Sequence, residues 1–289
     1  KNKFKALQEV ELMKRLGGYK NIVSIEESAS VNANNEHGKN YLFIRMELLT
    51  SLATLIDEDE LAENEVITAA IDICEALEEC HKQNIAHRDI KPENVFVSSE
   101  GVYKLGDFGI SKIFKDGVSV TQTSRNEYTP MYAAPEILRA YDVNYLLSDI
   151  YSLGLVLYKL LNNNILPFGP CSQDDILKKR ISEKDIPEPK FCCKELASIV
   201  WKALQYEPEN RYQSVADMKK DLLTLVEGTS SGKNNAYSQW LCKAGKDAYN
   251  AQQYDDAFKF FLESKNLGYN KASHYIGICL YHGFGTEQD

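Results

Sequence analysis

The amino-acid sequence predicts an α+β fold in which helices predominate, followed by a separate helical segment. Two strand-like segments, 22–30 and 41–47, lie between helical patterns near the start of the chain. A predicted helix over 148–161 is apolar on nearly all sides, as expected at the centre of a core. Residues 237–289 are enriched in Ala, Tyr, Gly and Phe, with a spacing typical of paired helices.

Helical and extended patterns alternate in the first part of the chain. Apolar residues with helical spacing run from Phe4 to Leu16, and Gly17 and Gly18 should end this helix. The polar segment 32–40 would form the turn between the two predicted strands. We therefore expect a helix followed by a β-hairpin.

The middle of the chain predicts one long helix and several loops. An amphipathic helix fits 63–83, and 102–105 has the pattern of a short strand. After the central apolar helix, two further helices fit 196–204 and 214–225. The residues between the long helix and the central helix are rich in loops and carry the polar motifs.

The composition argues against several classes of function. A formal net charge of -9 disfavours a nucleic-acid partner or an anionic membrane surface, and the cluster Lys178-Lys179-Arg180 is expected on a solvated helix face. Seven cysteines without a paired C-x-x-C pattern are typical of free thiols in a reducing compartment. The longest apolar run, 153–161, is too short to cross a bilayer. We therefore expect a cytoplasmic protein with no membrane insertion within this chain.

Residues 87–94 read His-Arg-Asp-Ile-Lys-Pro-Glu-Asn and carry groups suited to phosphoryl transfer. Asp89 and Asn94 would share a short loop that aims a carboxylate at an incoming hydroxyl while an amide oxygen binds a cation. Lys91 between them can place its ammonium beside the moving phosphoryl group. The tripeptide His-Arg-Asp alone could occur by chance on a surface, but the full eight-residue string is very hard to obtain by chance.

A second motif, Asp107-Phe108-Gly109, follows the short predicted strand. The Asp107 carboxylate would bridge magnesium to nucleotide phosphates, while a buried Phe108 holds it in place and Gly109 allows a sharp turn. Alone, this tripeptide would more often be a simple strand–turn. Its position thirteen residues after Asn94 favours one shared site.

Residues 1–227, with these motifs and Ala-Pro-Glu at 134–136, resemble the protein kinase family without its first strands. Lys91 resembles the serine/threonine branch, and the whole is similar to the eukaryotic-like serine/threonine kinases of bacteria. The resemblance implies a bilobal fold with an incomplete small lobe and a mainly helical large lobe. It also implies transfer of the γ-phosphate of ATP, with Mg²⁺ or Mn²⁺, to hydroxyls of protein substrates.

The resemblance also assigns catalytic roles, position by position. Asp89 would be the catalytic base, and Lys91 would contact the γ-phosphate. Asn94 and Asp107 would be the metal ligands. Arg88, next to the catalytic aspartate, would pair with a phosphate on the activation loop.

Other residues are implied to bind the nucleotide. Met46 resembles the gatekeeper, the backbone groups of Glu47 and Leu49 would face the adenine, and Phe96 would form its apolar floor.

A further set is implied to hold the site together. Glu9 resembles the ion-pairing glutamate of the regulatory helix, with Glu11 as a near neighbour that offers an alternative. The remaining structural residues are His87 and Phe108 of a stacked spine, Glu136 with its partner Arg211, and Asp149 beneath the catalytic loop.

Segment 112–129 resembles an activation loop. Its string Ser-Val-Thr-Gln-Thr is similar to the autophosphorylated stretch of bacterial kinases, so Thr121 and Thr123 are the expected phosphorylation sites. A plain polar loop is the alternative. Thr129 resembles the substrate-loop threonine that forms hydrogen bonds with the catalytic loop.

The sequence departs from the family at its start. It has no Gly-x-Gly-x-x-Gly loop and no strand lysine to pair with Glu9. Either the sequence begins late or the molecule is a truncated nucleotide binder, and we expect the late start. This chain alone should then be inactive, whereas the intact protein should be a kinase. The alternative function is a pseudokinase scaffold that acts by binding proteins.

A linker is predicted over 228–236, followed by a helical repeat segment over 237–289. From Tyr254 onward the sequence resembles an incomplete Sel1-like repeat, related to the tetratricopeptide helix pair, which implies protein partners. An ordinary helical extension of the first domain is the alternative. Small residues that allow close helix approach occupy the matching positions: Ala257, Gly268, Ala272, Gly277, Gly283 and Gly285.

Overall fold

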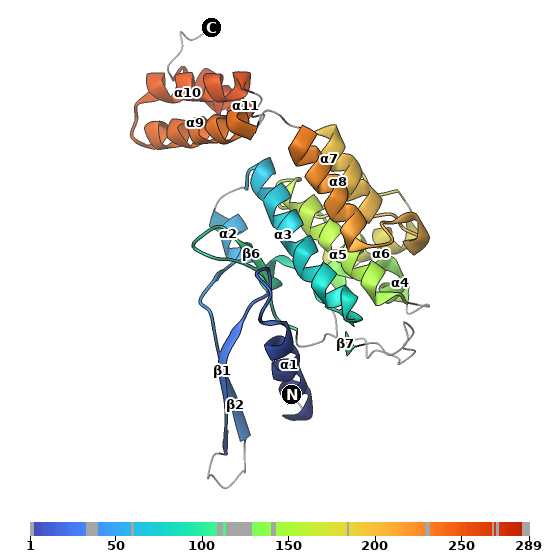
Figure 1. The fold of residues 1–289 in the computed structure, drawn as a ribbon. Helices are drawn as coiled ribbons and strands as arrows, with labels where there is room; N and C mark the ends of the chain where they lie inside the picture. The colour runs from blue at the N-terminus through green and yellow to red at the C-terminus, as the bar shows by residue number, and fades with distance from the viewer. Residues whose placement is uncertain are drawn as a thin grey trace. The chain divides into compact units, whose positions relative to one another are not determined.

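A computed structural model gives the fold of the chain (Figure 1). Contacts divide it into two compact units, Lys1–Leu223 and Thr224–Asp289. The described residues are 3–32, 40–58, 61–108, 112–113, 129–139, 143–183, 185–228, 232–267, 269 and 272–284.

The first unit begins with a helix and a hairpin. Helix α1 (Lys3–Leu16) precedes the antiparallel strands β1 (Ile25–Asn32) and β2 (Asn40–Met46), as the sequence predicted. Strand β1 starts three residues later than expected, because Ile22 forms a parallel bridge with Leu105 instead of joining the hairpin. The segment after α1 is thereby fixed to the body of the unit.

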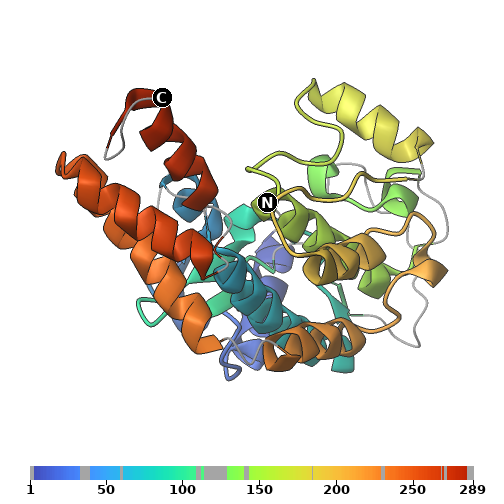
Figure 2. The ribbon, with the colours of Figure 1, turned by 90° about the horizontal axis from the view of Figure 1, so that it is seen from above.

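Short strands and two long helices form the centre of the first unit. Strands β3 (Thr50–Ser51), β5 (Val95–Val97) and β6 (Tyr103–Leu105) make a small antiparallel sheet. Helices α3 (Glu63–Lys82) and α5 (Tyr145–Leu160) lie side by side in Figures 1 and 2. Nearly every residue of α5 is buried, as its apolar sequence predicted.

The other elements of the first unit surround this centre, and the mixture of helices and small sheets agrees with the predicted α+β class. They are α2 (Leu52–Glu58), the pair β4 (Ile85–Ala86) and β7 (Lys112–Ile113), the short helices η1 (Pro92–Asn94), η2 (Pro130–Tyr132) and η3 (Pro208–Asn210), helices α4 (Pro135–Arg139), α6 (Gln173–Ser182) and α7 (Lys194–Ala203), and the larger part of α8 (Val215–Gly228).

The second unit is helical, with α9 (Gly232–Asn250), α10 (Tyr254–Asn266) and α11 (Ala272–His282) (Figure 1). Helix α9 begins inside the predicted linker. Once a helix has nucleated, each further residue adds a hydrogen bond, so weak helix formers can extend its end.

A close approach of two helices defines the core of the second unit. Gly245 on α9 faces Phe261 on α10, and an added Cβ would lie 2.6 Å from the phenylalanine ring. The ring of Phe261 is fully buried and stacks on Tyr275 of α11 at 5.0 Å. A residue larger than glycine at position 245 would therefore separate these helices.

Among the described residues, no helix combines the length and the apolar character that a membrane span requires.

We predict that Gly245→Ala destabilises the second unit. Overpacking a core costs about 1–3 kcal/mol, which exceeds the gain of about 1 kcal/mol expected from alanine in a helix. The matched control is Gly277→Ala on α11, where nothing lies within 4 Å of an added Cβ, so the unit should become more stable. Urea unfolding followed by Trp240 fluorescence in a Trp201→Phe background measures both. Equal effects of the two alanines would contradict the prediction.

Candidate active site

A buried carboxylate on α5 holds the loop that carries the His-Arg-Asp motif. Asp149 is fully buried and accepts hydrogen bonds from the backbone N–H groups of His87 and Arg88, both at 2.8 Å. The Nε2 group of His81 donates to the same carboxylate at 3.0 Å. Arg88 has a φ of 73°, which costs free energy in a residue other than glycine. Asp149 therefore stabilises a strained backbone just before Asp89.

His87 joins this loop to the segment that carries the second motif. Its buried Nε2 group donates to the carbonyl of Gly106 at 2.9 Å, while Nδ1 accepts from the backbone N–H of Asp89 at 3.3 Å. Burial lowers the pKa of His87, which fits this neutral tautomer. The rings of His87 and Phe108 meet edge to face at 4.8 Å. The two predicted spine residues are thus in contact.

Three side chains, those of Lys91, Thr129 and Asn94, converge on the carboxylate of Asp89. Lys91 Nζ lies 2.7 Å from one oxygen, and Thr129 Oγ1 donates to the other at 2.6 Å. Lys91 also donates to Thr129 at 2.9 Å. Burial alone would raise the pKa of Asp89. The hydrogen bonds from Lys91, Thr129 and Asn94 outweigh the effect of burial, so the pKa lies below its usual value. The carboxylate is therefore ionised at neutral pH.

Asn94 and Asp107 lie on segments that a backbone hydrogen bond joins, from Gly106 N to Asn94 O at 3.0 Å. Both N–H groups of the Asn94 amide donate to Asp89, at 2.7 and 2.9 Å, so its oxygen is the atom left for a cation. Asp107 is exposed, with a φ of 56°. No group of three or more His, Cys, Asp or Glu side chains in the described part could hold a metal ion. Other ligands would have to complete any coordination.

The residues expected to face a nucleotide lie at the end of β2 and on β5. Met46 is exposed, whereas Leu49 and Phe96 are half-buried. An added Cβ on Gly106 would lie 2.9 Å from the Phe96 ring and 2.8 Å from Val23. Glycine at this position therefore lets Phe96 lie close to the backbone that leads into the second motif.

The side chain of Glu47 has a role that the sequence interpretation missed, because only its backbone was considered. Its carboxylate accepts from the backbone N–H and the hydroxyl of Ser24, at 2.8 and 3.1 Å, and forms an ion pair with Lys104 at 2.6 Å. Burial would raise the pKa of Glu47, but the bonds from Lys104 and Ser24 lower it. Glu47 thus joins the end of β2 to both β6 and the segment after α1.

The sequence model of the protein kinase domain family matches residues 1–223 of this chain. This chain belongs to the protein kinase family. The resemblance to the protein kinase family therefore has independent support for the first unit, and the match ends where that unit ends.

Several curated relatives are serine/threonine-protein kinases of bacteria. PknB of Mycobacterium leprae is 38% identical over 167 residues, which are 57% of this chain and 26% of that protein. PknB of Mycobacterium tuberculosis is 37% identical over 175 residues, 59% of this chain and 28% of that protein. A probable serine/threonine-protein kinase of Streptomyces coelicolor is 33% identical over 205 residues, 69% of this chain and 30% of that protein. The chain thus spans between about a quarter and a third of their length.

Some predicted kinase residues lie outside the described set. Gly109, Thr121 and Thr123 are among them, as is most of the expected activation loop. Glu9 lies on α1, but its side chain is likewise outside the described residues.

The predicted pair of Glu136 and Arg211 forms a buried bidentate ion pair, with both N–O distances at 2.8 Å. Ser148 on α5 donates to the same carboxylate at 2.8 Å, and the guanidinium lies 4.7 Å from the centre of the Tyr151 ring. Residues 75 positions apart thereby fix the start of α4 to the end of the kinase domain.

The prediction that Lys178-Lys179-Arg180 lies on a solvated helix face is wrong for Arg180. Lys178 and Lys179 are exposed, but Arg180 is only 1% exposed. It lies one helical turn after the buried Ile176, on the same face of α6. This spacing could have predicted that Arg180 is buried, although its two neighbours in the basic cluster are exposed. Its guanidinium donates to backbone carbonyls near η2.

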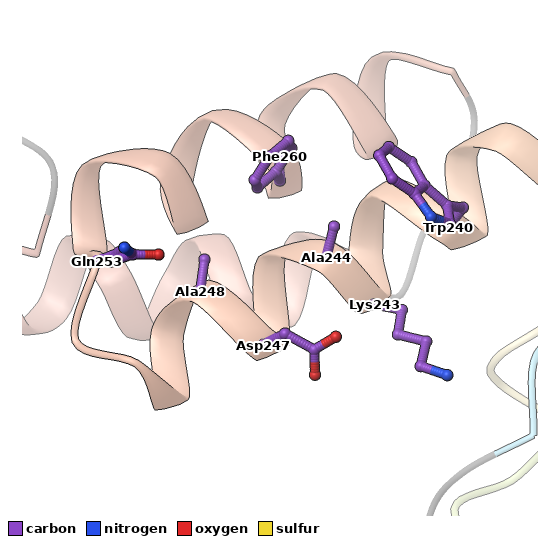
Figure 3. Close-up of a pocket in the computed structure, with 7 residues that line it drawn as sticks. All are labelled: Trp240, Lys243, Ala244, Asp247, Ala248, Gln253 and Phe260. Carbon is purple, nitrogen blue, oxygen red and sulfur yellow. The ribbon is translucent and has the colours of Figure 1, made fainter.

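The second unit has a shallow hollow of about 470 Å³ over α9 and α10 (Figure 3). The rings of Trp240 and Phe260 meet edge to face there at 6.4 Å, and Trp240 is 57% exposed. The other residues that line the hollow are Lys243, Ala244, Asp247, Ala248 and Gln253.

We predict that Lys91→Met raises the pKa of Asp89. Burial raises this pKa, and the variant removes the ammonium group that lowers it. The ionised Asp89 contributes stability above its unfolded pKa of about 3.9, and this stability is lost as the pH falls through the lower folded pKa. In the variant the loss should begin at a higher pH. Carboxyl NMR titration measures the shift. Lys104→Met is the control, and an equal shift of Asp89 there would contradict the assignment.

We also predict that Glu136→Gln destabilises the kinase domain by about 3–5 kcal/mol, because it leaves the buried Arg211 guanidinium without its carboxylate. Combining it with Arg211→Met should cost less than the sum of the single variants. Urea unfolding of the three variants measures the coupling. Additive losses would show that the pair does not act as a unit.

Proposed function

We propose that this chain carries the phosphotransfer site of a serine/threonine protein kinase, which moves the γ-phosphate of ATP to a protein hydroxyl. The observation that carries the proposal is the ionised Asp89 carboxylate held between Lys91, Thr129 and Asn94. The bacterial serine/threonine-protein kinases that match the chain support it.

In this proposal Asp89 orients the incoming hydroxyl and accepts its proton. Lys91 contributes a positive charge where negative charge spreads over the transferred phosphoryl oxygens. Thr129 keeps both groups in position through its bonds to Asp89 and Lys91. Most of the catalytic effect then comes from positioning and charge, which this reaction type requires.

The oxygen groups of Asn94 and Asp107 fit Mg²⁺ or Mn²⁺, which prefer amide and carboxylate oxygens. Such an ion, when bound, would neutralise the nucleotide phosphates. Phe96, with the backbone of Glu47 and Leu49 and the gatekeeper Met46, would hold the adenine, and Glu9 would orient a strand lysine. Arg88, whose guanidinium lies 4.6 Å from the centre of the Tyr145 ring, would pair with phosphorylated Thr121 or Thr123.

A second proposed activity is protein binding by the second unit. Its Sel1-like pattern and the exposed Trp240 at the hollow over α9 and α10 support this part. It fits either an active kinase or a pseudokinase scaffold. The exposed Asp107 and the intact Asp89 loop favour the active kinase, for which a cytoplasmic location is also proposed.

The complete natural protein with Asp89→Asn should lose phosphotransfer by at least about a hundredfold, because general-base catalysis contributes factors of this size. Phosphopeptide mapping of the expressed protein measures the effect and should find modified Thr121 and Thr123 in the parent protein alone. The control Asp185→Asn changes an exposed acid on a loop and should leave the map unchanged. Transfer by Asp89→Asn at the parent rate would overturn the proposed function.

A further inference from the structure

The buried Arg180 of α6 donates two hydrogen bonds to backbone carbonyls of another segment. Its two terminal nitrogens bind the carbonyl oxygens of Met131 and Ala133. The guanidinium also lies 5.8 Å from the centre of the Tyr151 ring on α5. An arginine in this position joins α6 to the short helix η2 and to the residue after it.

The electrostatics of this arginine are unusual. Burying a guanidinium is costly unless it is paired, and no carboxylate in the described part of the chain forms an ion pair with Arg180. Arg211, whose guanidinium lies over the same Tyr151 ring as that of Arg180, has its own carboxylate partner in Glu136. The carbonyl oxygens must therefore compensate the charge through charge-assisted hydrogen bonds. Such an arrangement fixes backbone geometry, because the planar guanidinium places its donors in one set direction.

Three consecutive carbonyls of this segment are held by side chains. Arg180 binds those of Met131 and Ala133, and Ser152 Oγ of α5 donates to that of Tyr132 at 2.8 Å. The segment leads directly from Thr129, whose hydroxyl donates to Asp89. A shift of this turn would therefore move Thr129 relative to the Asp89 carboxylate.

We infer that Arg180 is a positioning residue for the protein substrate, acting through segment 129–133. It holds this segment so that Thr129 meets Asp89 and the backbone beside it presents a fixed surface to the acceptor polypeptide. The inference rests on the proposed kinase function. It assigns to α6 a part in acceptor binding and no part in nucleotide binding.

The test is Arg180→Lys in the complete natural protein. Lysine keeps the charge but cannot donate to two carbonyls from one planar group. We expect the KM for an acceptor peptide to rise about tenfold, because peptide binding would then have to supply the ordering that one charge-assisted hydrogen bond gives this segment in the parent protein. The KM for ATP should change by less than about twofold, since α6 would not bind the nucleotide. A merely structural role would change both constants.

A second readout does not depend on catalysis. The amides of Tyr132 and Ala133 donate within the turn, to Thr129 O at 3.0 Å and Pro130 O at 3.2 Å. In Arg180→Lys their hydrogen exchange should accelerate about tenfold, while the Leu105 amide, bonded to Asn21 O at 2.8 Å, should not change. Unchanged exchange at Tyr132 and Ala133 would overturn the inference.

Two further variants complete the design. Ser152→Ala removes the hydrogen bond from Ser152 to the carbonyl of Tyr132 in the same turn. It should change the peptide KM and the amide exchange in the same direction as Arg180→Lys, with a smaller effect. This variant tests the inference even if Arg180→Lys does not fold. Arg139→Lys on α4 changes an exposed arginine and should leave all values at those of the parent protein.

The outcomes separate the two proposals. A parent protein that transfers no phosphate, yet shows faster exchange in Arg180→Lys, contradicts the kinase function and supports only the fixing of the turn. An active parent protein whose peptide KM is unaffected by Arg180→Lys contradicts the inference alone.

Discussion

The buried carboxylate of Asp149 is the interaction on which the candidate site depends. It accepts two backbone N–H groups from residues 87 and 88 and holds Arg88 in a left-handed conformation that costs free energy. Because α5 is buried on nearly all sides, the carboxylate cannot move without disturbing the core. The position of the next residue, Asp89, is thus determined by the rigid helix α5 and not by the loop alone.

From this anchor, hydrogen bonds extend to the rest of the site. His87 binds the carbonyl of Gly106, and the Gly106 amide binds the carbonyl of Asn94. The loops that carry Asp89 and Asp107 are therefore cross-linked by short-range bonds, although they come from separate stretches of sequence. Thr129 joins a third segment to Asp89. Preorganisation of this kind is what a reaction controlled by positioning requires.

The sequence predicted the elements whose patterns are local, such as α1, the hairpin and the apolar α5, and it named the residues that meet around Asp89. It missed Arg180 because a basic cluster is usually solvated, and burial of one member depends on a distant turn. It missed the Glu47 side chain for the same reason, since Ser24 and Lys104 lie far away in the sequence. The start of α9 depends on helix propagation, which composition does not encode.

The acids of the first unit differ in their surroundings in a way that bears on metal binding. Asp149 is satisfied by backbone N–H groups, Glu136 by Arg211, Glu47 by Lys104 and Asp89 by Lys91. Each of these carboxylates is buried or half-buried and has its charge balanced within the protein. Asp107, by contrast, is exposed, at the end of a segment held by His87 and Asn94. Among these five acids, Asp107 is the one whose carboxylate would bind a dissolved cation at the lowest desolvation cost, and this supports the metal role proposed for it.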